Sequence, residues 1–285
     1  MKFAIAVLLG VLLWSCGGKN EITVGSKNFT EQIILGEMAA QQIERKLHLP
    51  VRRQLDLGGT LLTQQAIVRG DIDLYPEYTG TAASAVLKEA IPSDPGLAYT
   101  EVKAAYLARF HLVWLPPLGF NDTFAMVVRK QDAKGLPKPD LSAAVSRPWR
   151  LGVGYEFLTR PDGLQRLGRV YGLHWQGTPQ TMDLGLLYQA LAEHKVDMAA
   201  GNSTDGLLDP SKFQVLADDK HAFPPYNACF VVRQALLDQR PEVATALTIL
   251  SDHIDEKTMR DLNRQVDVEH QPVVLVVRNF LAKQP

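Results

Sequence analysis

The chain has 285 residues with 30 basic and 31 acidic side chains, and 46% of its residues are hydrophobic. This balance of charge predicts no broad surface for nucleic acid or for an anionic membrane. After an N-terminal leader, about 270 residues remain, enough for one large domain or two modest lobes. Apart from the N-terminus, no apolar run reaches the ~18 residues of a membrane-spanning helix, so we expect a soluble mature body.

The N-terminus has the pattern of a secretory signal. Lys2 is followed by an apolar run that is too short to span a bilayer and that ends at Leu13-Trp14-Ser15-Cys16. This ending resembles the lipobox of bacterial lipoproteins. It implies a signal peptide over residues 1–15, a lipid-bearing Cys16 and a tether over residues 16–20, and therefore a protein held outside the cytoplasm on a bacterial membrane. The alternative is an ordinary signal peptide with an incidental cysteine.

Short strands and helices alternate along the rest of the chain. Asn28, with Glu31 three residues later, fits a capping box that would open the first helix. A proline at the start of residues 161–171 suits the first turn of a later helix. Hydrophobic patterning predicts strands at 22–24, 51–57, 72–75, 151–154 and 196–200, and helices at about 28–47, 60–70, 161–171 and 185–194. Such alternation is typical of largely parallel sheets covered by helices.

Two further apolar strands link the two βα sets. Residues 124–129 and 228–232 predict strands that cross between the lobes, and Cys229 in the second of them reads as a buried hydrophobic residue. We therefore expect one lobe over residues 21–121 plus 226–285, and another over 122–225. Residues 241–283 have a mostly helical pattern and would pack back on the first lobe.

The polar and glycine-rich segments between these elements predict a binding cleft. Ligands of open α/β sheets lie beyond the carboxyl ends of the strands, where such loops converge. The loops concerned are 26–32, 58–60, 75–81, 121–124, 155–162, 201–205 and 224–227. The chain has no HExxH, no GxSxG elbow, no Walker loop and no GxGxxG. We therefore expect a binding protein without catalytic residues, metal or cofactor.

Several collinear motifs resemble those of the glycine betaine/choline/proline-betaine substrate-binding proteins, which serve osmoprotectant ABC importers. The motifs cover nearly all of the mature chain: Gly25-Ser26-Lys27-Asn28-Phe29-Thr30-Glu31-Gln32, Leu57-Gly58-Gly59-Thr60, Gly70 to Thr81, Gly119 to Thr123, Arg160 to Leu164, Asp218-Asp219-Lys220 and Pro224-Pro225-Tyr226. The resemblance implies an α/β fold of the type II periplasmic-binding-protein kind, with two lobes joined by two hinge strands and the ligand between them.

The resemblance also implies how the ligand would be held. A quaternary ammonium has no N–H donor, so aromatic faces must bind it, each contributing roughly 0.5–2 kcal/mol. A ligand carboxylate instead takes charge-assisted hydrogen bonds. Tyr78, Tyr226 and Phe124 match the aromatic cage, with Phe124 where a tyrosine is usual, and Asp122 matches a position near the cation. Lys27, Thr81 and Arg160 match the carboxylate side, and Gln32 at the head of the first helix is a further candidate.

Asn202 departs from the family pattern, because it lies where the second lobe usually supplies another tyrosine. An amide offers hydrogen bonds in place of a π face. The implied ligand is therefore a quaternary-ammonium or zwitterionic solute such as glycine betaine, choline or carnitine, or a betaine with a further polar group such as ergothioneine. A monomeric receptor would deliver it to a permease in the cytoplasmic membrane powered by an ATPase. The alternative is a sensor subunit of a membrane signalling receptor with the same fold.

Overall fold

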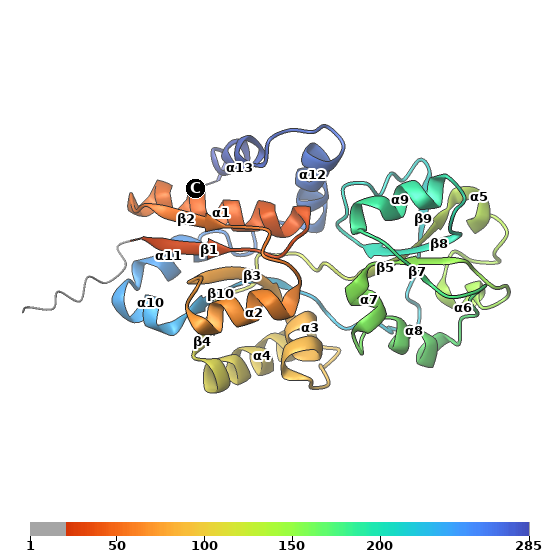
Figure 1. Cartoon of the computed structure of the whole chain (residues 1–285), viewed down its shortest axis with the longest axis horizontal. Coiled ribbons are helices and arrows are strands. Elements are labelled where there is room, and N and C mark those ends of the chain that lie inside the picture. The colour runs from red at the N-terminus through yellow and green to blue at the C-terminus, as the bar shows by residue number, and fades with distance from the viewer. Residues whose placement is uncertain (1–20, 285) are drawn as a thin grey trace, which may run out of the picture.

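The computed structural model describes residues 21–284, and these form two α/β lobes side by side (Figure 1). The first lobe is built on a five-stranded sheet with the order β2-β1-β3-β10-β4, and the second on a sheet with the order β7-β6-β8-β5-β9. The strands are β1 Ile22–Gly25, β2 Val51–Gln54, β3 Leu74–Tyr78, β4 Leu112–Trp114, β5 Phe124–Arg129, β6 Leu151–Val153, β7 Gln180–Thr181, β8 Met198–Asn202, β9 Phe213–Leu216 and β10 Ala228–Arg233.

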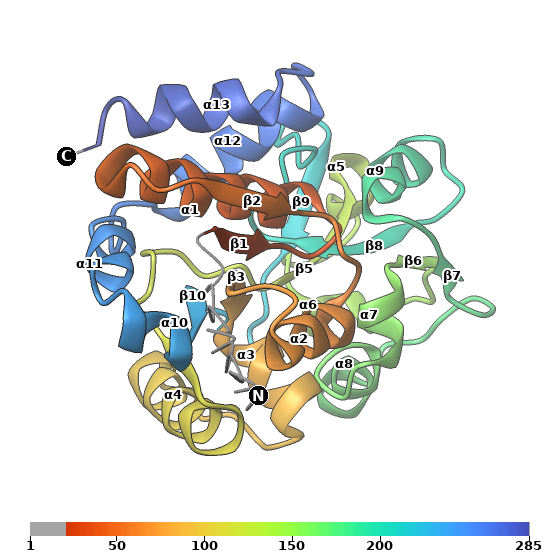
Figure 2. The ribbon, with the colours of Figure 1, turned by 60° about the vertical axis from the view of Figure 1, so that its left-hand side comes forward.

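The helices of the first lobe come from both ends of the chain. They are α1 Thr30–Leu47, α2 Thr60–Arg69, α3 Thr79–Thr81, the π-helix η1 Ala82–Leu87, α4 Pro95–Phe110, α10 Gln234–Gln239, α11 Glu242–Thr248, α12 Glu256–Asp267 and α13 Val273–Leu281. Helix α1 packs against α11, α12 and α13, and Figure 2 shows α13 running alongside it. The helices near the C-terminus thus pack on the first helix of this lobe.

The helices of the second lobe are α5 Lys130–Ala133, α6 Leu141–Ala144, α7 Tyr155–Thr159, α8 Leu164–Tyr171 and α9 Leu184–Ala192. The single helix predicted over residues 161–171 was wrong at its start. Pro161 lies in a turn between α7 and α8, and α8 begins after Gly163. A Cβ at Gly163 would lie 2.1 Å from the carbonyl oxygen of Phe157, so the backbone doubles back on itself there. Helix α7, which the pattern did not show, is the element that approaches the first lobe.

Both sheets are mixed, and this explains how the chain changes lobes. Strand β10 runs antiparallel to β3 and β4, and β5 runs antiparallel to β8 and β9, whereas the remaining pairs are parallel. The predicted crossing strands therefore belong each to one sheet, β5 to the second and β10 to the first. The chain crosses in the segments before them, residues 115–123 and 217–227, which pair through a bridge between Asn121 and Asn227.

The capping box predicted for α1 was wrong. The helix begins at Thr30, and its N-cap, Phe29, has no side-chain cap hydrogen bond. The Glu31 carboxyl accepts hydrogen bonds from residues of β3, α12 and the second lobe instead of closing the box. A tertiary contact has thus replaced a local one, and the side chain is directed towards the other lobe.

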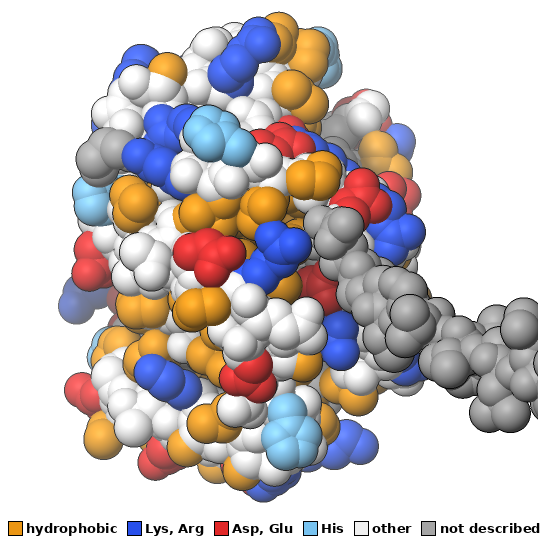
Figure 3. Space-filling model, turned by 90° about the vertical axis from the view of Figure 1, so that its left-hand side faces the viewer, with side chains coloured by type: hydrophobic (Ala, Val, Ile, Leu, Met, Phe, Trp, Pro, Cys, Tyr) orange, Lys and Arg blue, Asp and Glu red, His pale blue; other side chains and the backbone are white. Residues whose placement is uncertain are grey.

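The core of each lobe consists of the apolar faces of its sheet and helices, and Cys229 is fully buried on β10, as expected. On the face of the first lobe remote from the second, basic, acidic and apolar side chains are interspersed (Figure 3). Within residues 21–284, none of the helices combines the length and the apolar character needed to cross a membrane. The predicted signal peptide, Cys16 and the tether lie outside the described residues.

Candidate ligand-binding cleft

A cleft between the two lobes collects most of the residues that the sequence singled out. Eight of the nine predicted residues line it: Lys27, Tyr78, Thr81, Asp122, Phe124, Arg160, Asn202 and Tyr226. They come from six separate stretches of the chain, which the two sheets and the connecting segments bring together. Gln32 is fully buried and is not among the lining residues. Its Oε1 accepts a hydrogen bond from the backbone N–H of Lys27 at 3.3 Å.

Tyr78 and Phe29 form the aromatic wall of the first lobe. Their rings are stacked with centroids 6.4 Å apart and an angle of 19° between the planes. The Tyr78 hydroxyl donates a hydrogen bond to Glu31 Oε1 at 2.7 Å. Burial raises the pKa of Tyr78 well above its ordinary value, and the nearby Glu31 charge adds to the effect. The phenol therefore stays neutral, and its ring presents an electron-rich face of the kind that attracts cations.

The second aromatic wall lies where the connecting segments meet the second lobe. Phe124 packs edge-on against Tyr226, Phe157 and Phe223, with centroids 5.5, 4.9 and 5.6 Å away. Tyr226 also lies directly against Gly80, where an added Cβ would be 2.5 Å from its ring carbons. The glycine after Thr79 thus lets an aromatic ring from residue 226 close over α3. Each ring is held by packing, so the wall is formed before any ligand arrives.

Arg160 is held by groups from both lobes. Its guanidinium pairs with Asp162, with Nη2 2.5 Å and Nε 3.0 Å from the two carboxylate oxygens. Its Nη1 also donates to the Thr81 hydroxyl of the first lobe at 3.1 Å. The Tyr226 hydroxyl donates to Asp162 Oδ2 at 2.7 Å. Burial alone would raise the pKa of Asp162, but the Arg160 hydrogen bonds and charge outweigh it and lower the pKa.

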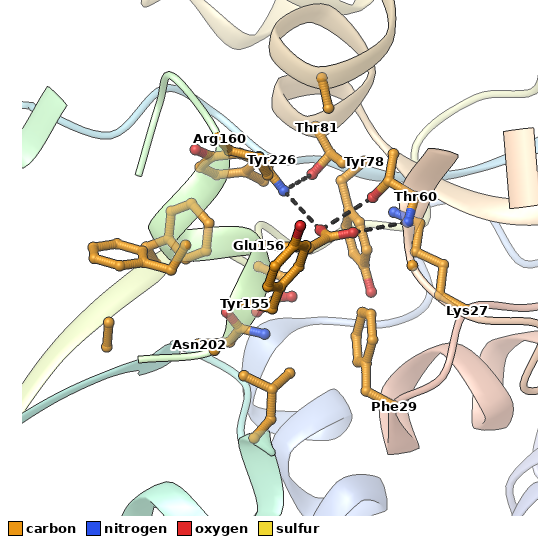
Figure 4. Close-up of a pocket in the computed structure, with 18 of the residues that line it drawn as sticks. Lys27, Phe29, Thr60, Tyr78, Thr81, Tyr155, Glu156, Arg160, Asn202 and Tyr226 are labelled. Atoms are coloured by element: carbon orange, nitrogen blue, oxygen red, sulfur yellow. Dashed lines mark hydrogen bonds and ion pairs between the residues drawn. The ribbon is translucent and has the colours of Figure 1, made fainter. Parts of the chain in front are cut away.

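Glu156 joins the lobes at the N-terminus of α2. Its Oε1 accepts a hydrogen bond from the backbone N–H of Thr60 at 2.8 Å, and its Oε2 accepts one from the Thr60 hydroxyl at 3.1 Å (Figure 4). Burial alone would raise the pKa of Glu156. The charges of Lys27 and Arg160, together with the Thr60 donors, lower it instead, so the carboxylate remains ionised. The N-terminus of α2 favours this negative charge as well, because it carries the positive end of the helix dipole.

Lys27 is committed to an ion pair. Its Nζ lies 2.5 Å from Glu77 Oε1, with the side chains of both residues almost completely buried. The same ammonium lies 5.1 Å from the centroid of the Tyr78 ring. Lys27 therefore lines the cleft with its charge already balanced by Glu77, and its ammonium contacts the ring of Tyr78.

The buried carboxyl groups of Glu31 and Asp122, and the partly buried one of Asp205, have no cationic partner among the described ion pairs. Burial raises the pKa of Glu31 to about 7 and that of Asp205 to about 6, although hydrogen bonds to both groups oppose the shift. Burial also raises the pKa of Asp122 well above its ordinary value, and the neighbouring carboxyls add to this. Within residues 21–284, no set of three or more metal-binding side chains is placed to hold a metal ion.

Asn202 and Tyr155 face the interior of the cleft from the second lobe. The backbone N–H of Asn202 donates to Asp205 Oδ2 at 2.9 Å, which leaves the amide side chain directed into the pocket (Figure 4). Tyr155 is 71% exposed although it lines the cleft, so its ring has little packing to hold it. The second lobe thus presents the hydrogen-bonding amide of Asn202 and the exposed aromatic ring of Tyr155 towards the first lobe.

Residues that sequence reasoning did not single out also line the cleft, among them Phe29, Glu31, Tyr155, Glu156 and Phe157. Phe29 and Glu31 lie inside a motif that the sequence already marked, so their position beside Lys27 was an available signal. Glu156 and Phe157 lie in the loop 155–162, but α7 was not predicted. Its five residues are too few to establish a helical period.

The chain is similar to known proteins over most of its length. Residues 20–283 match the family described as the substrate-binding domain of the ABC-type glycine betaine transport system. A glycine-betaine-binding protein of Pseudomonas aeruginosa is 35% identical over 272 residues, which cover 91% of this chain and 86% of that protein. A crystal structure described as a glycine betaine/carnitine/choline ABC transporter is 31% identical, with a TM-score of 0.78 over 92% of this chain and 98% of that one.

A third relative is longer than this chain. The ergothioneine transport permease/ergothioneine binding protein EgtU of Helicobacter pylori is 33% identical over 284 residues, which cover 97% of this chain and 51% of that protein. The chain therefore spans about half the length of this relative.

Proposed function

Because the chain belongs to the family of substrate-binding domains of ABC-type glycine betaine transport systems, and so is a substrate-binding protein of such an importer, we propose that its interlobe cleft captures a quaternary-ammonium or zwitterionic solute. The family serves ABC permeases. Delivery of the solute to a permease of the cytoplasmic membrane, by a monomer that carries out no reaction itself, is part of the proposal.

The observation that carries this proposal is the pairing of aromatic faces with unbalanced carboxyls. Tyr78 and Tyr226 supply neutral, buried rings, whereas the buried cations Lys27 and Arg160 are each already paired with a carboxylate. The charge left over in the cleft is therefore acidic, from Glu31, Asp122 and Asp205. A cation that is desolvated against aromatic faces gains from both features.

Contacts from both lobes explain why the solute would favour closure. Tyr78 belongs to the first lobe and Asn202 to the second, and a ligand between them touches both sets of residues only when the lobes meet. A ligand shifts an equilibrium between two conformations by its difference in affinity for them. Capture of the solute and closing of the lobes are then the same event.

Asn202 makes a plain methylated cation an incomplete fit. Its amide would hydrogen-bond to a polar group beyond the carboxylate, which the ergothioneine named for one relative carries and the glycine betaine named for another lacks. The proposed ligand is thus a betaine or a related trimethylammonium compound with a hydrogen-bonding substituent. We also propose that the lipobox-like sequence at Cys16 anchors the receptor to the membrane.

Titration calorimetry and thermal-shift measurements on the purified chain test this proposal. The solutes are glycine betaine, choline, carnitine and ergothioneine, with dimethylbutanol, the uncharged carbon isostere of choline, as the matched control. We expect micromolar or tighter binding of at least one cation or zwitterion and no binding of the isostere. No response to any of the four charged solutes would overturn the ligand class.

A further inference from the structure

Two carboxyl groups from different parts of the molecule meet on a single hydroxyl at the side of the cleft. Glu31 lies in the first turn of α1 in the first lobe, and Asp122 lies in the connecting segment before β5. The Thr204 hydroxyl, from the second lobe, is 2.5 Å from Glu31 Oε2 and 2.7 Å from Asp122 Oδ1. All three residues are buried.

The Thr204 hydroxyl and two ionised carboxylates would have one proton too few for the two hydrogen bonds between them. A threonine hydroxyl has one proton, so it can donate to only one of the two carboxyl oxygens. The other contact is a hydrogen bond only if that carboxyl is protonated and donates to Thr204 Oγ1. Without the proton, a buried carboxylate would face the lone pairs of the hydroxyl oxygen, which is costly in a site shielded from water.

The other neighbours of Glu31 cannot supply the missing proton. Tyr78 of β3 donates its single hydroxyl proton to Glu31 Oε1. Asn263 of α12 donates to Glu31 Oε2 at 3.0 Å and to the carbonyl oxygen of Thr204 at 2.9 Å. The hydroxyl proton of Tyr78 and both amide protons of Asn263 are therefore already in use, and Asn263 also ties Thr204 to α12 of the first lobe.

The surrounding charges leave the cluster acidic. From the second lobe, Asp205 faces it and accepts the Tyr188 hydroxyl of α9. On α12, Asp267 accepts a hydrogen bond from the Thr30 hydroxyl and lies near His270. Arg260 of the same helix donates hydrogen bonds to the carbonyl oxygen of Ser203. Next to Tyr78, Lys27 is paired with Glu77. Among the residues that the structure describes, the charges that shift the pKa of Glu31 and Asp122 are those of neighbouring carboxyls.

We propose that closing of the two lobes captures one proton, which Glu31 and Asp122 share through Thr204, so that the closed form becomes more populated as the pH falls. Opening takes Thr204 away from Glu31 and admits water, and both carboxyls then ionise as ordinary acids. The proton is thus bound by the closed form and released by the open one.

The direction of the pH effect follows from the shifted acidities. In the closed form, burial raises the pKa of Glu31 to about 7, whereas an exposed glutamate titrates near 4.3. A group whose pKa is higher in the closed form stabilises that form fully below its open-form pKa. This contribution is lost as the pH rises through the closed-form value. The ratio of closed to open protein should therefore fall by up to about tenfold per pH unit between roughly pH 5 and pH 7, and level off above that range.

Spin-label distance measurements on the ligand-free chain test this directly and do not depend on the identity of any solute. Labels are placed at Lys46→Cys on α1 and Ala192→Cys on α9, both exposed positions, in a full-length chain that carries Cys16→Ser. Cys229 is buried and stays unlabelled. Between pH 5 and pH 8.5, we expect the short-distance population to give way to a longer one.

Two substitutions separate the shared proton from other titrations. Asp122→Asn replaces the second carboxyl by an amide that donates to Thr204 permanently, while Thr204 donates to Glu31, so the closed population should lose its dependence on pH. Thr204→Ser keeps the hydroxyl and should retain the pH dependence, which also guards against a folding defect at this site. A closed fraction that is constant from pH 5 to pH 8.5 in the unsubstituted chain, or a pH response in Asp122→Asn equal to that of the parent, would overturn the proposal.

Discussion

Glu156 and Thr60 lie in different lobes, yet the carboxylate of the first caps the helix that begins at the second. One oxygen of Glu156 accepts the backbone N–H of Thr60 and the other accepts its hydroxyl. Helix N-termini favour anions because their first N–H groups have no partner within the helix. The second lobe thus supplies a cap for α2, and the Thr60 N–H has this partner only when the lobes are together.

Gly59→Ala tests this interlobe cap. The backbone at Gly59 suits any residue, but an added Cβ would lie 2.8 Å from Glu156 Oε1 and would push the carboxylate away. Loss of a charge-assisted contact costs roughly 1–2 kcal/mol, so we expect solute affinity to fall about 5- to 30-fold while the melting temperature changes little. Calorimetry and thermal unfolding measure the two effects.

Gly168→Ala is the matched control for this substitution. Gly168 lies within α8, and an added Cβ there would meet no atom within 4 Å. Affinity should be unchanged and stability should rise by roughly 0.5–1 kcal/mol, as for alanine in a helix interior. Equal affinities of Gly59→Ala and Gly168→Ala would show that the cap does not contribute to binding.

Lys27→Met tests whether Lys27 stabilises the folded protein through its ion pair with Glu77. Removing it leaves Glu77 buried without its counter-ion, and loss of one partner of a buried pair typically costs about 3–5 kcal/mol. We expect the melting temperature to drop by roughly 10 °C. Adding Glu77→Gln should recover part of the loss, because an uncharged amide no longer needs the lysine. A double substitution less stable than Lys27→Met would contradict the role of the pair.

The alternation of strands and helices was visible in the sequence because each element keeps one hydrophobic period over several residues. Phe124–Arg129 and the C-terminal helices are examples. The sheet to which each of the two apolar crossing strands belongs was not visible in the sequence, because an apolar run does not reveal which sheet it joins or in which direction it runs. The partners of Glu31 were equally hidden: Tyr78, Thr204 and Asn263 are 47, 173 and 232 positions away in the chain.

Asn202→Tyr tests how the second lobe selects its solute. The backbone bond from Asn202 to Asp205 does not depend on the side chain, so the local turn should persist. A tyrosine would add a π face worth roughly 0.5–2 kcal/mol to a methylated cation, which corresponds to about a 2- to 30-fold gain in affinity for glycine betaine. A solute that hydrogen-bonds to the amide should lose affinity.

The comparison between solutes gives this prediction its control. Titration of the parent and Asn202→Tyr chains with glycine betaine and with ergothioneine should show opposite changes, so that their affinity ratio moves further than either value alone. If both affinities shifted in parallel, Asn202 would affect closing of the cleft and not the choice of solute.

The central claim is that Tyr78 and Tyr226 bind a cation through their rings. The most direct test is the calorimetric affinity of the best-binding solute for Tyr226→Ala, Tyr226→Phe and Tyr78→Ala, with Tyr99→Ala, at a partly buried position of the first lobe outside the cleft, as the control. Loss of a desolvated cation–π face should weaken binding at least tenfold in both cleft alanine variants. Tyr226→Phe loses only the hydrogen bond to Asp162 and should stay within about threefold of the parent. Unchanged affinity in Tyr78→Ala and Tyr226→Ala would contradict the aromatic cage.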